Sequence, residues 1–92
     1  MLYFQAQGDF IFAFDSNNNK YIINESLKAI KELICQDSFF QINRSEIINF
    51  NYITKFKSYT KNRLEIFLAN FNTLVYTFNS KTPEFRLWIE QH

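Results

Sequence analysis

The chain has 92 residues, of which 47% are apolar and 20% aromatic, so its composition predicts one globular domain with a single modest core. Its formal net charge is only +1, which excludes a large basic surface spread over the whole domain. No apolar run approaches the length of a membrane span and no signal peptide is recognisable, so we expect a cytoplasmic protein.

The first quarter of the chain predicts three antiparallel strands. Residues 2–7 and 10–14 alternate in the manner of strands, and Gly8-Asp9 between them is typical of a turn. The polar run 16–19 is rich in Asn, which tolerates the left-handed backbone of a hairpin. It therefore predicts a second turn, which leads into a returning strand at residues 20–23.

A helix is predicted next. Ser26 is a suitable N-cap for a helix from Leu27 to about Cys35. Cys35 lies on the buried side of the helix end, which favours a core thiol over a redox sensor. The apolar residues of the helix share one face at helical spacing: Leu27, Ile30, Leu33 and Ile34.

The second half of the chain is dominated by further strand patterns. Lys61-Asn62 and Ala69-Asn70 are candidates for tight turns between them. The expected strands are residues 39–42, 46–49, 53–59, 63–68 and 71–78.

A short amphipathic helix is expected at the C-terminus. Thr82 would cap it, Pro83 suits its first position, and Glu84 complements the positive end of the helix dipole. Trp88 would dock it. Strands and helices do not alternate, so the sequence predicts a mainly β domain of short antiparallel strands, with one packed helix and this short C-terminal helix.

The most informative segment is a polar knuckle between two apolar strands. Asn43-Arg44-Ser45 follows Phe39-Phe40 and precedes Ile47-Ile48. Arginine can fork onto guanine, asparagine can pair with adenine, and serine can bond to phosphate. These residue types can therefore contact DNA. The alternative is a surface Arg44 that pairs with Glu46 or packs its stem on aromatic rings.

Positive charge gathers in the second part of the chain. Residues 1–37 sum to −2, whereas residues 38–92 sum to +3. One run of nine residues contains no acid and carries four basic side chains: Lys55, Lys57, Lys61 and Arg63. Lys55 and Lys57 are candidates for phosphate contacts. The alternative is a solvated strand edge that lysines protect from aggregation.

Enzymatic function is not expected. The only histidine is His92, at the end of the chain, so no Ser–His or Cys–His pair can form within the domain. Gly8 is the only glycine, which excludes a glycine-rich phosphate loop. One cysteine and one histidine cannot make a metal site or an internal disulfide. We expect no metal, no cofactor and no catalytic residue.

The order of residue types resembles the LytTR family of DNA-binding domains. That family shows two aromatic residues, then His-Arg-Ser, then Val-Asn after a short apolar run, where this chain has Phe39-Phe40, Asn43-Arg44-Ser45 and Ile48-Asn49. Ser26-Leu27-Lys28 is similar to the start of the family's helix. The resemblance implies an elongated stack of antiparallel sheets with a helix on its side.

The resemblance also implies that loops, not a recognition helix, enter successive major grooves. The three segments would be the turn at Gly8-Asp9, Asn43-Arg44-Ser45 and Asn79-Ser80-Lys81. In them, Asn43 and Arg44 would contact base edges, Lys81 a base or a phosphate, and Ser45 and Ser80 phosphates. The chain departs from the family at Asn43 (usually His), at 79–81 (usually Ser-Arg) and in the acidic Asp9.

We therefore predict that residues 1–92 are one domain of a larger bacterial transcriptional regulator, whose receiver or sensor part lies outside this chain. In a two-component system it would bind double-stranded DNA as the output domain, with two copies on direct repeats. An interaction module that keeps the fold without binding DNA is the main alternative. A third is a single-strand binder of the barrel type.

Overall fold

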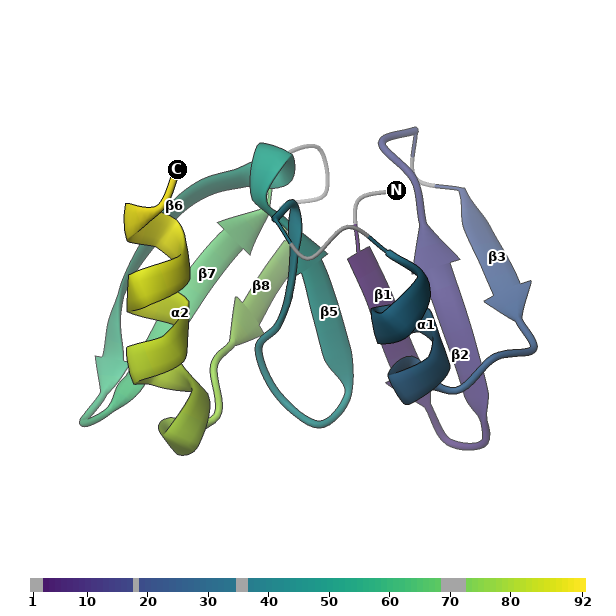
Figure 1. Ribbon diagram of the computed structural model, residues 1–92, viewed down its shortest axis with the longest axis horizontal. Coiled ribbons are helices and arrows are strands. Elements are labelled where there is room, and N and C mark those ends of the chain that lie inside the picture. The colour runs from purple at the N-terminus through teal and green to yellow at the C-terminus, as the bar shows by residue number, and fades with distance from the viewer. Residues whose placement is uncertain (1–2, 18, 35–36, 69–72) are drawn as a thin grey trace.

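The computed structural model describes residues 3–17, 19–34, 37–68 and 73–92. Within them, eight strands form two antiparallel sheets, one of five strands and one of three (Figure 1). The strands are β1 (Tyr3–Gln7), β2 (Phe10–Phe14), β3 (Lys20–Ile23), β4 (Phe39–Gln41), β5 (Glu46–Asn49), β6 (Ile53–Thr60), β7 (Arg63–Leu68) and β8 (Thr73–Tyr76). The helical elements are α1 (Leu27–Leu33), α2 (Thr82–Glu90) and the 3-10 turns η1 (Phe50–Tyr52) and η2 (Asn79–Lys81).

The five-stranded sheet has the order β3-β2-β1-β5-β4 and contains the polar knuckle between its last two strands. Its centre is β1, which pairs with β2 through the turn at Gly8 and with β5 from much later in the chain. Tyr3 accordingly lies opposite Phe14 on one side and Ile48 on the other. Gly8 has φ +61°, a left-handed conformation that favours glycine.

Around β4 and β5 this sheet is covered on both faces, which explains the apolar pairs Phe39-Phe40 and Ile47-Ile48. Successive side chains of a strand point to opposite faces. Ile47 and Phe39 pack in the core beneath α1, whereas Ile48 and Phe40 pack in the core between the two sheets. Each buried isoleucine contributes about 1.5–3 kcal/mol relative to exposure, so both faces hold the knuckle's flanking strands in place.

The buried apolar residues form two separate cores, one on each face of the five-stranded sheet. The core beneath α1 is small and contains Phe4, Ala13, Leu27, Ile30 and Ile47. The larger core joins the sheets and α2 through Tyr3, Ile42, Ile48, Leu64, Ile66, Leu68, Val75, Phe85 and Trp88. Figure 1 shows α1 lying over the five-stranded sheet and α2 over the three-stranded sheet, at the other end of the molecule.

The three-stranded sheet has the order β6-β7-β8 and follows the predicted alternation. Leu64, Ile66 and Leu68 are buried on the face toward the core, while the residues between them are only partly buried. On α2, Phe85 is fully buried and Trp88 is 6% exposed, which confirms that this helix docks through its apolar face. The structure therefore confirms the mainly β fold with one packed helix and a short C-terminal helix.

The first helix is shorter than predicted and buries fewer of its apolar residues. Ser26 caps α1 as expected, since its side chain accepts the Ala29 N–H at 3.1 Å. The helix ends at Leu33, and Cys35 lies outside the described residues. Leu33 is 76% exposed. At roughly 100° per residue it lies about 60° from Ile30 and about 120° from Leu27 around the helix axis, at the margin of the buried face. Its exposure shows that the prediction of a buried face including Leu33 was wrong.

The end of the chain also differs from the prediction. The last strand covers Thr73–Tyr76 instead of 71–78, and residues 71–72, like the turn expected at 69–70, lie outside the described residues. Thr82 does not cap α2, because η2 precedes the helix and Lys81 takes the N-cap position. The Thr82 hydroxyl instead bonds to the Asn62 carbonyl at 2.7 Å, so it ties the helix start to the β6–β7 turn.

The domain extends over 34 × 25 × 25 Å. Asn62 has φ +66°, which confirms the predicted turn between β6 and β7. Asn49 is buried, and its side chain accepts the Asn51 N–H at 2.9 Å, so it caps η1. Within the described part of the chain, neither helix has the length and apolar character needed to span a membrane.

Candidate nucleic-acid interface

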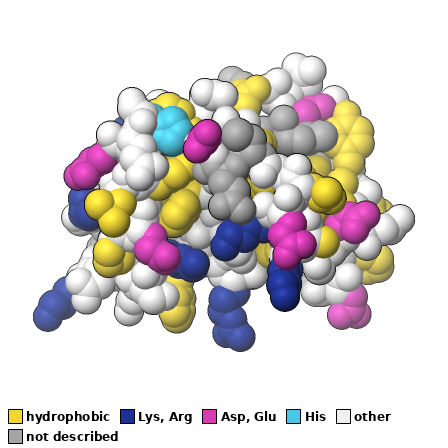
Figure 2. Space-filling view, viewed as in Figure 1, with side chains coloured by type: hydrophobic (Ala, Val, Ile, Leu, Met, Phe, Trp, Pro, Cys, Tyr) yellow, Lys and Arg dark blue, Asp and Glu magenta, His cyan; other side chains and the backbone are white. Residues whose placement is uncertain are grey.

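The three segments singled out in the sequence lie along one edge of the molecule. In the orientation of Figure 1, the β1–β2 turn, the loop that enters β5 and the turn that leads into α2 all reach its lower edge. Figure 2 shows that Lys and Arg side chains on this face lie mostly in its lower half. The fold therefore brings together segments that are about 35 residues apart in sequence.

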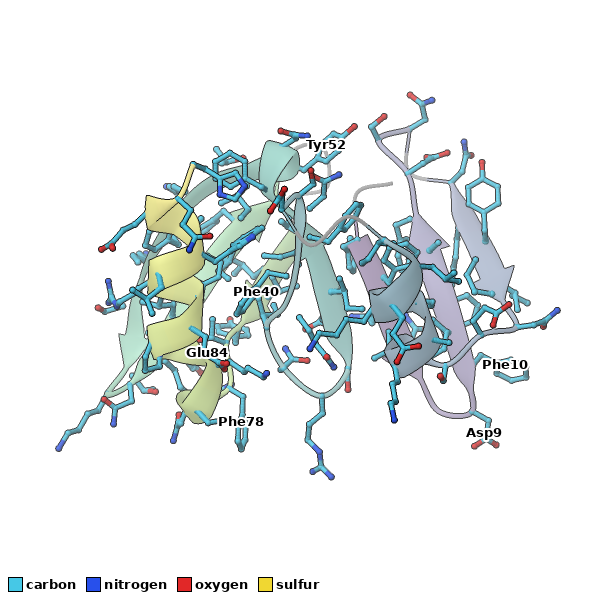
Figure 3. All side chains as sticks on the ribbon, viewed as in Figure 1. Asp9, Phe10, Phe40, Tyr52, Phe78 and Glu84 are labelled. Carbon is cyan, nitrogen blue, oxygen red and sulfur yellow. The ribbon has the colours of Figure 1, made fainter. Side chains whose placement is uncertain are left out.

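The first segment is the exposed turn at Gly8-Asp9, between β1 and β2. Asp9 is exposed and lies at the lower edge in Figure 3. Phe10 beside it is 56% exposed. A shallow cavity between this turn and the start of α1 is lined by Asp9, Phe10, Glu25 and Ser26 among others. Two acids in one cavity make this the least favourable of the three segments for a phosphate.

The central loop is held by the side chain of Asn43. One amide hydrogen bonds to Glu46 Oε1 at 2.9 Å and another to the Tyr76 carbonyl at 2.8 Å. The Asn43 oxygen accepts the Ser45 N–H at 2.8 Å, and the Ser45 carbonyl accepts the Ala6 N–H at 2.7 Å. Both amide hydrogens of Asn43 are thus engaged inside the protein, and the loop is fixed to β1 and β8.

Arg44, next to Asn43, is exposed and unconstrained. Within the described part of the chain it makes no hydrogen bond or ion pair. Glu46 is occupied elsewhere, because its Oε2 accepts from Gln5 Nε2 at 2.7 Å and its Oε1 from Asn43. The structure therefore does not show the Arg44–Glu46 pair that was the alternative reading, and the guanidinium is available to a ligand.

A second arginine lies beside Arg44. A shallow cavity of about 360 Å³ is lined by Arg44 and Arg63 together with Tyr76 and Phe78. Arg63 donates from Nε to the Thr77 carbonyl at 3.0 Å, which fixes its position on β7. The cavity thus combines one free guanidinium, one fixed guanidinium, the Glu46 carboxylate and the side chain of Phe78, which is 51% exposed.

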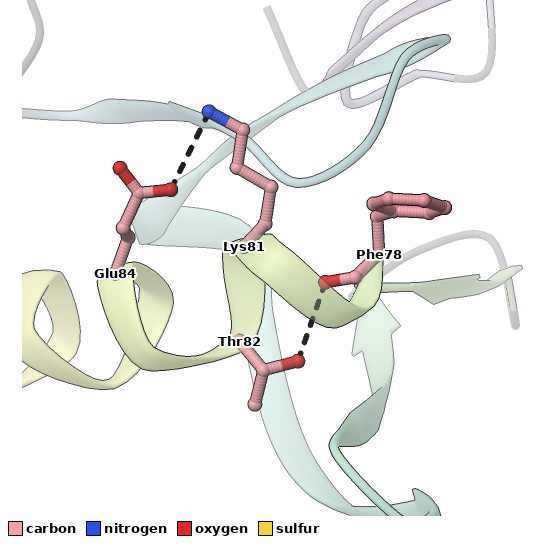
Figure 4. A network of polar contacts seen from close by, with 4 residues as sticks. All are labelled: Phe78, Lys81, Thr82 and Glu84. Atoms are coloured by element: carbon pink, nitrogen blue, oxygen red, sulfur yellow. Dashed lines mark hydrogen bonds and ion pairs between the residues drawn. The ribbon is translucent and has the colours of Figure 1, made fainter.

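The third segment is the 3-10 turn η2. A cavity of about 220 Å³ is lined by Arg44, Ser80 and Lys81, so this segment adjoins the central loop. Ser80 is exposed. Lys81 is partly buried, and its ammonium lies 3.5 Å from the Glu84 carboxylate (Figure 4). Lys81 is therefore partly neutralised, and Ser80 and Arg44 are the more accessible groups.

The strand lysines occupy a different surface. Lys55 and Lys57 are exposed on β6, and their ammonium groups lie 4.7 Å and 5.5 Å from the centre of the Phe67 ring. Phe56 between them packs on Phe85 of α2, so the two lysines face away from that helix. They make cation–π contacts on the sheet and line none of the cavities around Arg44.

A family model described as the LytTr DNA-binding domain matches residues 1–90. This chain belongs to the LytTr family. It is a DNA-binding domain, which confirms the resemblance seen in the sequence. A solved structure has the same fold: the LytTr DNA-binding domain of a Bacillus cereus protein described as a methyl-accepting/DNA response regulator. The two share 23% identity over 96% of this chain and 79% of that one, with a TM-score of 0.88. The curated proteins contain no match.

The LytTr family is a class of DNA-binding domains and not of catalysts, which agrees with the lack of a catalytic motif in the sequence. Within the residues that the structure describes, no cluster of three His, Cys, Asp or Glu side chains could hold a metal ion. The chemistry at the lower edge is that of recognition: a guanidinium, hydroxyls, an ammonium and backbone amides, all suited to polar contact with DNA.

Two arginines of this LytTr domain were not assigned to the site from the sequence. Arg63 was noticed only as part of a basic cluster, because its approach to Arg44 depends on how the two sheets meet. Arg86 lies on the exposed side of α2. Its helical spacing from the buried Phe85 and Trp88 predicts that Arg86 is exposed. The sequence does not predict that it lies beside the β6–β7 hairpin.

Proposed function

We propose that this LytTr domain binds double-stranded DNA sequence-specifically, as the cytoplasmic output domain of a bacterial transcriptional regulator. A receiver or sensor domain elsewhere in the regulator would control it, and two copies would bind direct repeats. The three segments at the lower edge would enter successive major grooves from one side of the duplex. Major grooves on one face recur about every 34–36 Å, which is comparable with the 34 Å length of the domain.

The observation that carries this proposal is the free guanidinium of Arg44 at the tip of a rigid loop. Arginine commonly reads guanine through two parallel hydrogen bonds to O6 and N7. Such a contact needs an arginine with unused donors and a backbone that holds it in place. Arg44 has unused donors, and the bonds of Asn43 and Ser45 fix the backbone on both sides.

The other predicted residues receive distinct tasks in this proposal. Asn43 positions the loop and does not read adenine, because that contact would need an amide hydrogen that Glu46 and Tyr76 already use. Ser45 and Ser80 contact phosphates, and Lys81 contacts a base or a phosphate after it leaves Glu84. The remaining candidates have weaker positions: Asp9, Lys55 and Lys57.

Selection of binding sites from a random duplex library tests the proposal. The purified domain should enrich a half-site, with repeats of it in the same orientation. Arg44→Ala should lose discrimination at one base pair, by about 1–3 kcal/mol, while the rest of the half-site persists. Fluorescence anisotropy of the selected duplex and of single-base variants measures this loss.

Arg44→Lys is the matched control, because it keeps the positive charge but cannot form the two parallel hydrogen bonds of a guanidinium. If Arg44 reads a base, the Lys variant loses discrimination as the Ala variant does. If it contacts only phosphate, the Lys variant keeps both affinity and preference. A wild-type domain that enriches no sequence, and prefers single strands or binds no DNA at physiological salt, would contradict the proposed function.

A further inference from the structure

A larger groove lies at the third segment, between the β6–β7 hairpin and the start of α2. Its volume is about 660 Å³. The hairpin contributes Ser58, Thr60 and Arg63, and the opposite wall contains Asn79, Ser80 and Arg86. Thr82 closes its base, since its hydroxyl bonds both to the Asn62 carbonyl and to the Thr77 hydroxyl at 2.7 Å. These hydrogen bonds join the β6–β7 turn, the segment after β8 and the start of α2, so they hold the groove in shape.

The charge in the groove has one sign. It contains two arginines, and among the described residues that line it there is no Asp or Glu. Its remaining polar groups are hydroxyls and amides from Ser, Thr and Asn, which are the usual uncharged partners of phosphate oxygens. A domain of net charge +1 that concentrates two arginines in one acid-free groove offers a local anion site despite its near-neutral total.

The two guanidinium groups are arranged differently. Arg63 is held by its Nε bond to the Thr77 carbonyl and lies over Tyr59 and Tyr76, 5.6 Å and 5.8 Å from their ring centres. Its terminal nitrogens are oriented in advance, which lowers the entropy lost when they bind an anion. Arg86 is exposed on α2, and within the described part of the chain it makes no hydrogen bond or ion pair.

The groove continues the surface around Arg44. Arg63 lines both this groove and the cavity that contains Arg44, and Ser80 lines both this groove and the cavity that contains Lys81. A DNA strand whose bases face Arg44 would thus pass its backbone over Arg63 and Ser80. The same strand, followed further, meets Arg86.

We propose that this groove binds the sugar-phosphate backbone of duplex DNA, with Arg63 and Arg86 as phosphate contacts outside the three reading segments. The proposal rests on the proposed function, because it needs the duplex at the lower edge. It assigns α2 a direct part in binding, in addition to packing against the sheets. A contact of this kind adds affinity and salt dependence but no sequence preference.

The test measures the salt dependence of binding to a labelled duplex of mixed sequence. Arg86→Gln removes one charge from an exposed helical position that glutamine also favours, so the domain should fold normally. The slope of log K against log salt should become shallower by about 0.9, the value for one phosphate. Affinity near physiological salt should fall roughly twofold to fivefold. Arg86→Lys should restore the slope.

Lys20→Gln is the control for a change in total charge. Lys20 begins β3, at the opposite end of the molecule from α2 (Figure 1), and is exposed. It should leave the slope unchanged. An Arg86→Gln slope equal to that of the wild type, or equal losses in both Gln variants, would overturn the groove proposal. If the wild type binds mixed duplexes but selects no sequence, only the proposed sequence reading fails.

Discussion

Asn43 and Arg44 are neighbours in one loop, yet the fold uses their side chains in different ways. The Asn43 amide bonds to Glu46, Tyr76 and Ser45, whereas the Arg44 guanidinium bonds to nothing within the described residues. The Asn43 side chain holds the loop in place, whereas the donors of Arg44 remain available to a ligand. A base-specific contact needs an arginine whose backbone is held in place, because the side chain must be presented close to its productive geometry.

Glu46 is the acceptor on which this loop depends. Glu46→Ala leaves the Gln5 amide and one of the two Asn43 amide hydrogens without an acceptor. The loop should therefore loosen, and affinity for the selected duplex should fall about tenfold, or roughly 1.4 kcal/mol. Glu46→Gln keeps one acceptor oxygen and should lose less. Both variants remove the same negative charge, so the difference between them in anisotropy titrations reports the hydrogen bonds.

The sequence preference of the two Glu46 variants separates positioning from plain stability. A loosened Arg44 should discriminate less at its base pair, while the salt slope stays close to that of the wild type, because no phosphate contact is lost. Equal affinity and equal preference in Glu46→Ala and Glu46→Gln would show that these hydrogen bonds do not position the loop.

At the level of elements, the β2–β3 turn is organised by a single carboxylate. Asp15 Oδ1 accepts the N–H groups of Asn17 and Asn19 at 2.9 Å, and its Oδ2 accepts from Tyr21 at 3.0 Å. The bond from the Asn19 N–H is the main reason that the pKa of Asp15 lies below its ordinary value of 3.8. The hydrogen bond that Tyr21 donates to the Asp15 carboxylate raises the pKa of the Tyr21 hydroxyl.

A lowered pKa makes the turn sensitive to acid. Because the folded state favours the ionised carboxylate, Asp15 stabilises the fold above pH 3.8, and this contribution disappears as the pH falls below 3.8 through the lowered pKa. The carboxyl carbon of Asp15, followed by NMR against pH, should titrate with a midpoint below 3.8. Asp15→Asn should remove this part of the acid sensitivity; a midpoint at or above 3.8 would refute it.

Elements with a simple periodicity were predictable from the sequence. Leu64, Ile66 and Leu68 alternate with partly buried residues, and β7 has the predicted bounds. The end of α1 was not predictable, since Leu33 continues the apolar pattern although no core lies on its side of the helix. The start of α2 was also missed, because Thr82 looks like a cap but bonds to Asn62, which is distant in sequence.

At the scale of the whole molecule, the interface depends on contacts between the two sheets. Asn43 bonds to the Tyr76 carbonyl, and the Phe78 N–H bonds to the Ile42 carbonyl at 2.9 Å. These two bonds set the distance between the central loop and the third segment. The sequence predicted both segments separately. It could not place Arg63 or Arg86 beside them, because their proximity arises from pairing and packing between residues far apart in the chain.

The three proposed DNA-binding segments share the lower edge of the molecule in Figure 1, whereas the exposed apolar residues Tyr21 and Ile22 lie on β3 at the outer edge of the five-stranded sheet. If the three segments bind DNA, Tyr21 and Ile22 should stay outside the contact. Identifying the residues that contact DNA is therefore the strongest test of the proposed binding edge.

The most direct measurement is an NMR titration of the ¹⁵N-labelled domain with its selected duplex, compared with a duplex of scrambled sequence. We expect the largest amide shifts in residues 8–9, 43–45 and 79–81, and we expect those at 43–45 to depend on the sequence of the duplex. The amides of Tyr21 and Ile22 should stay unchanged. Shifts centred on β3 or on the outer side of α1, with none at 43–45, would contradict the central claim that Arg44 and its loop read DNA.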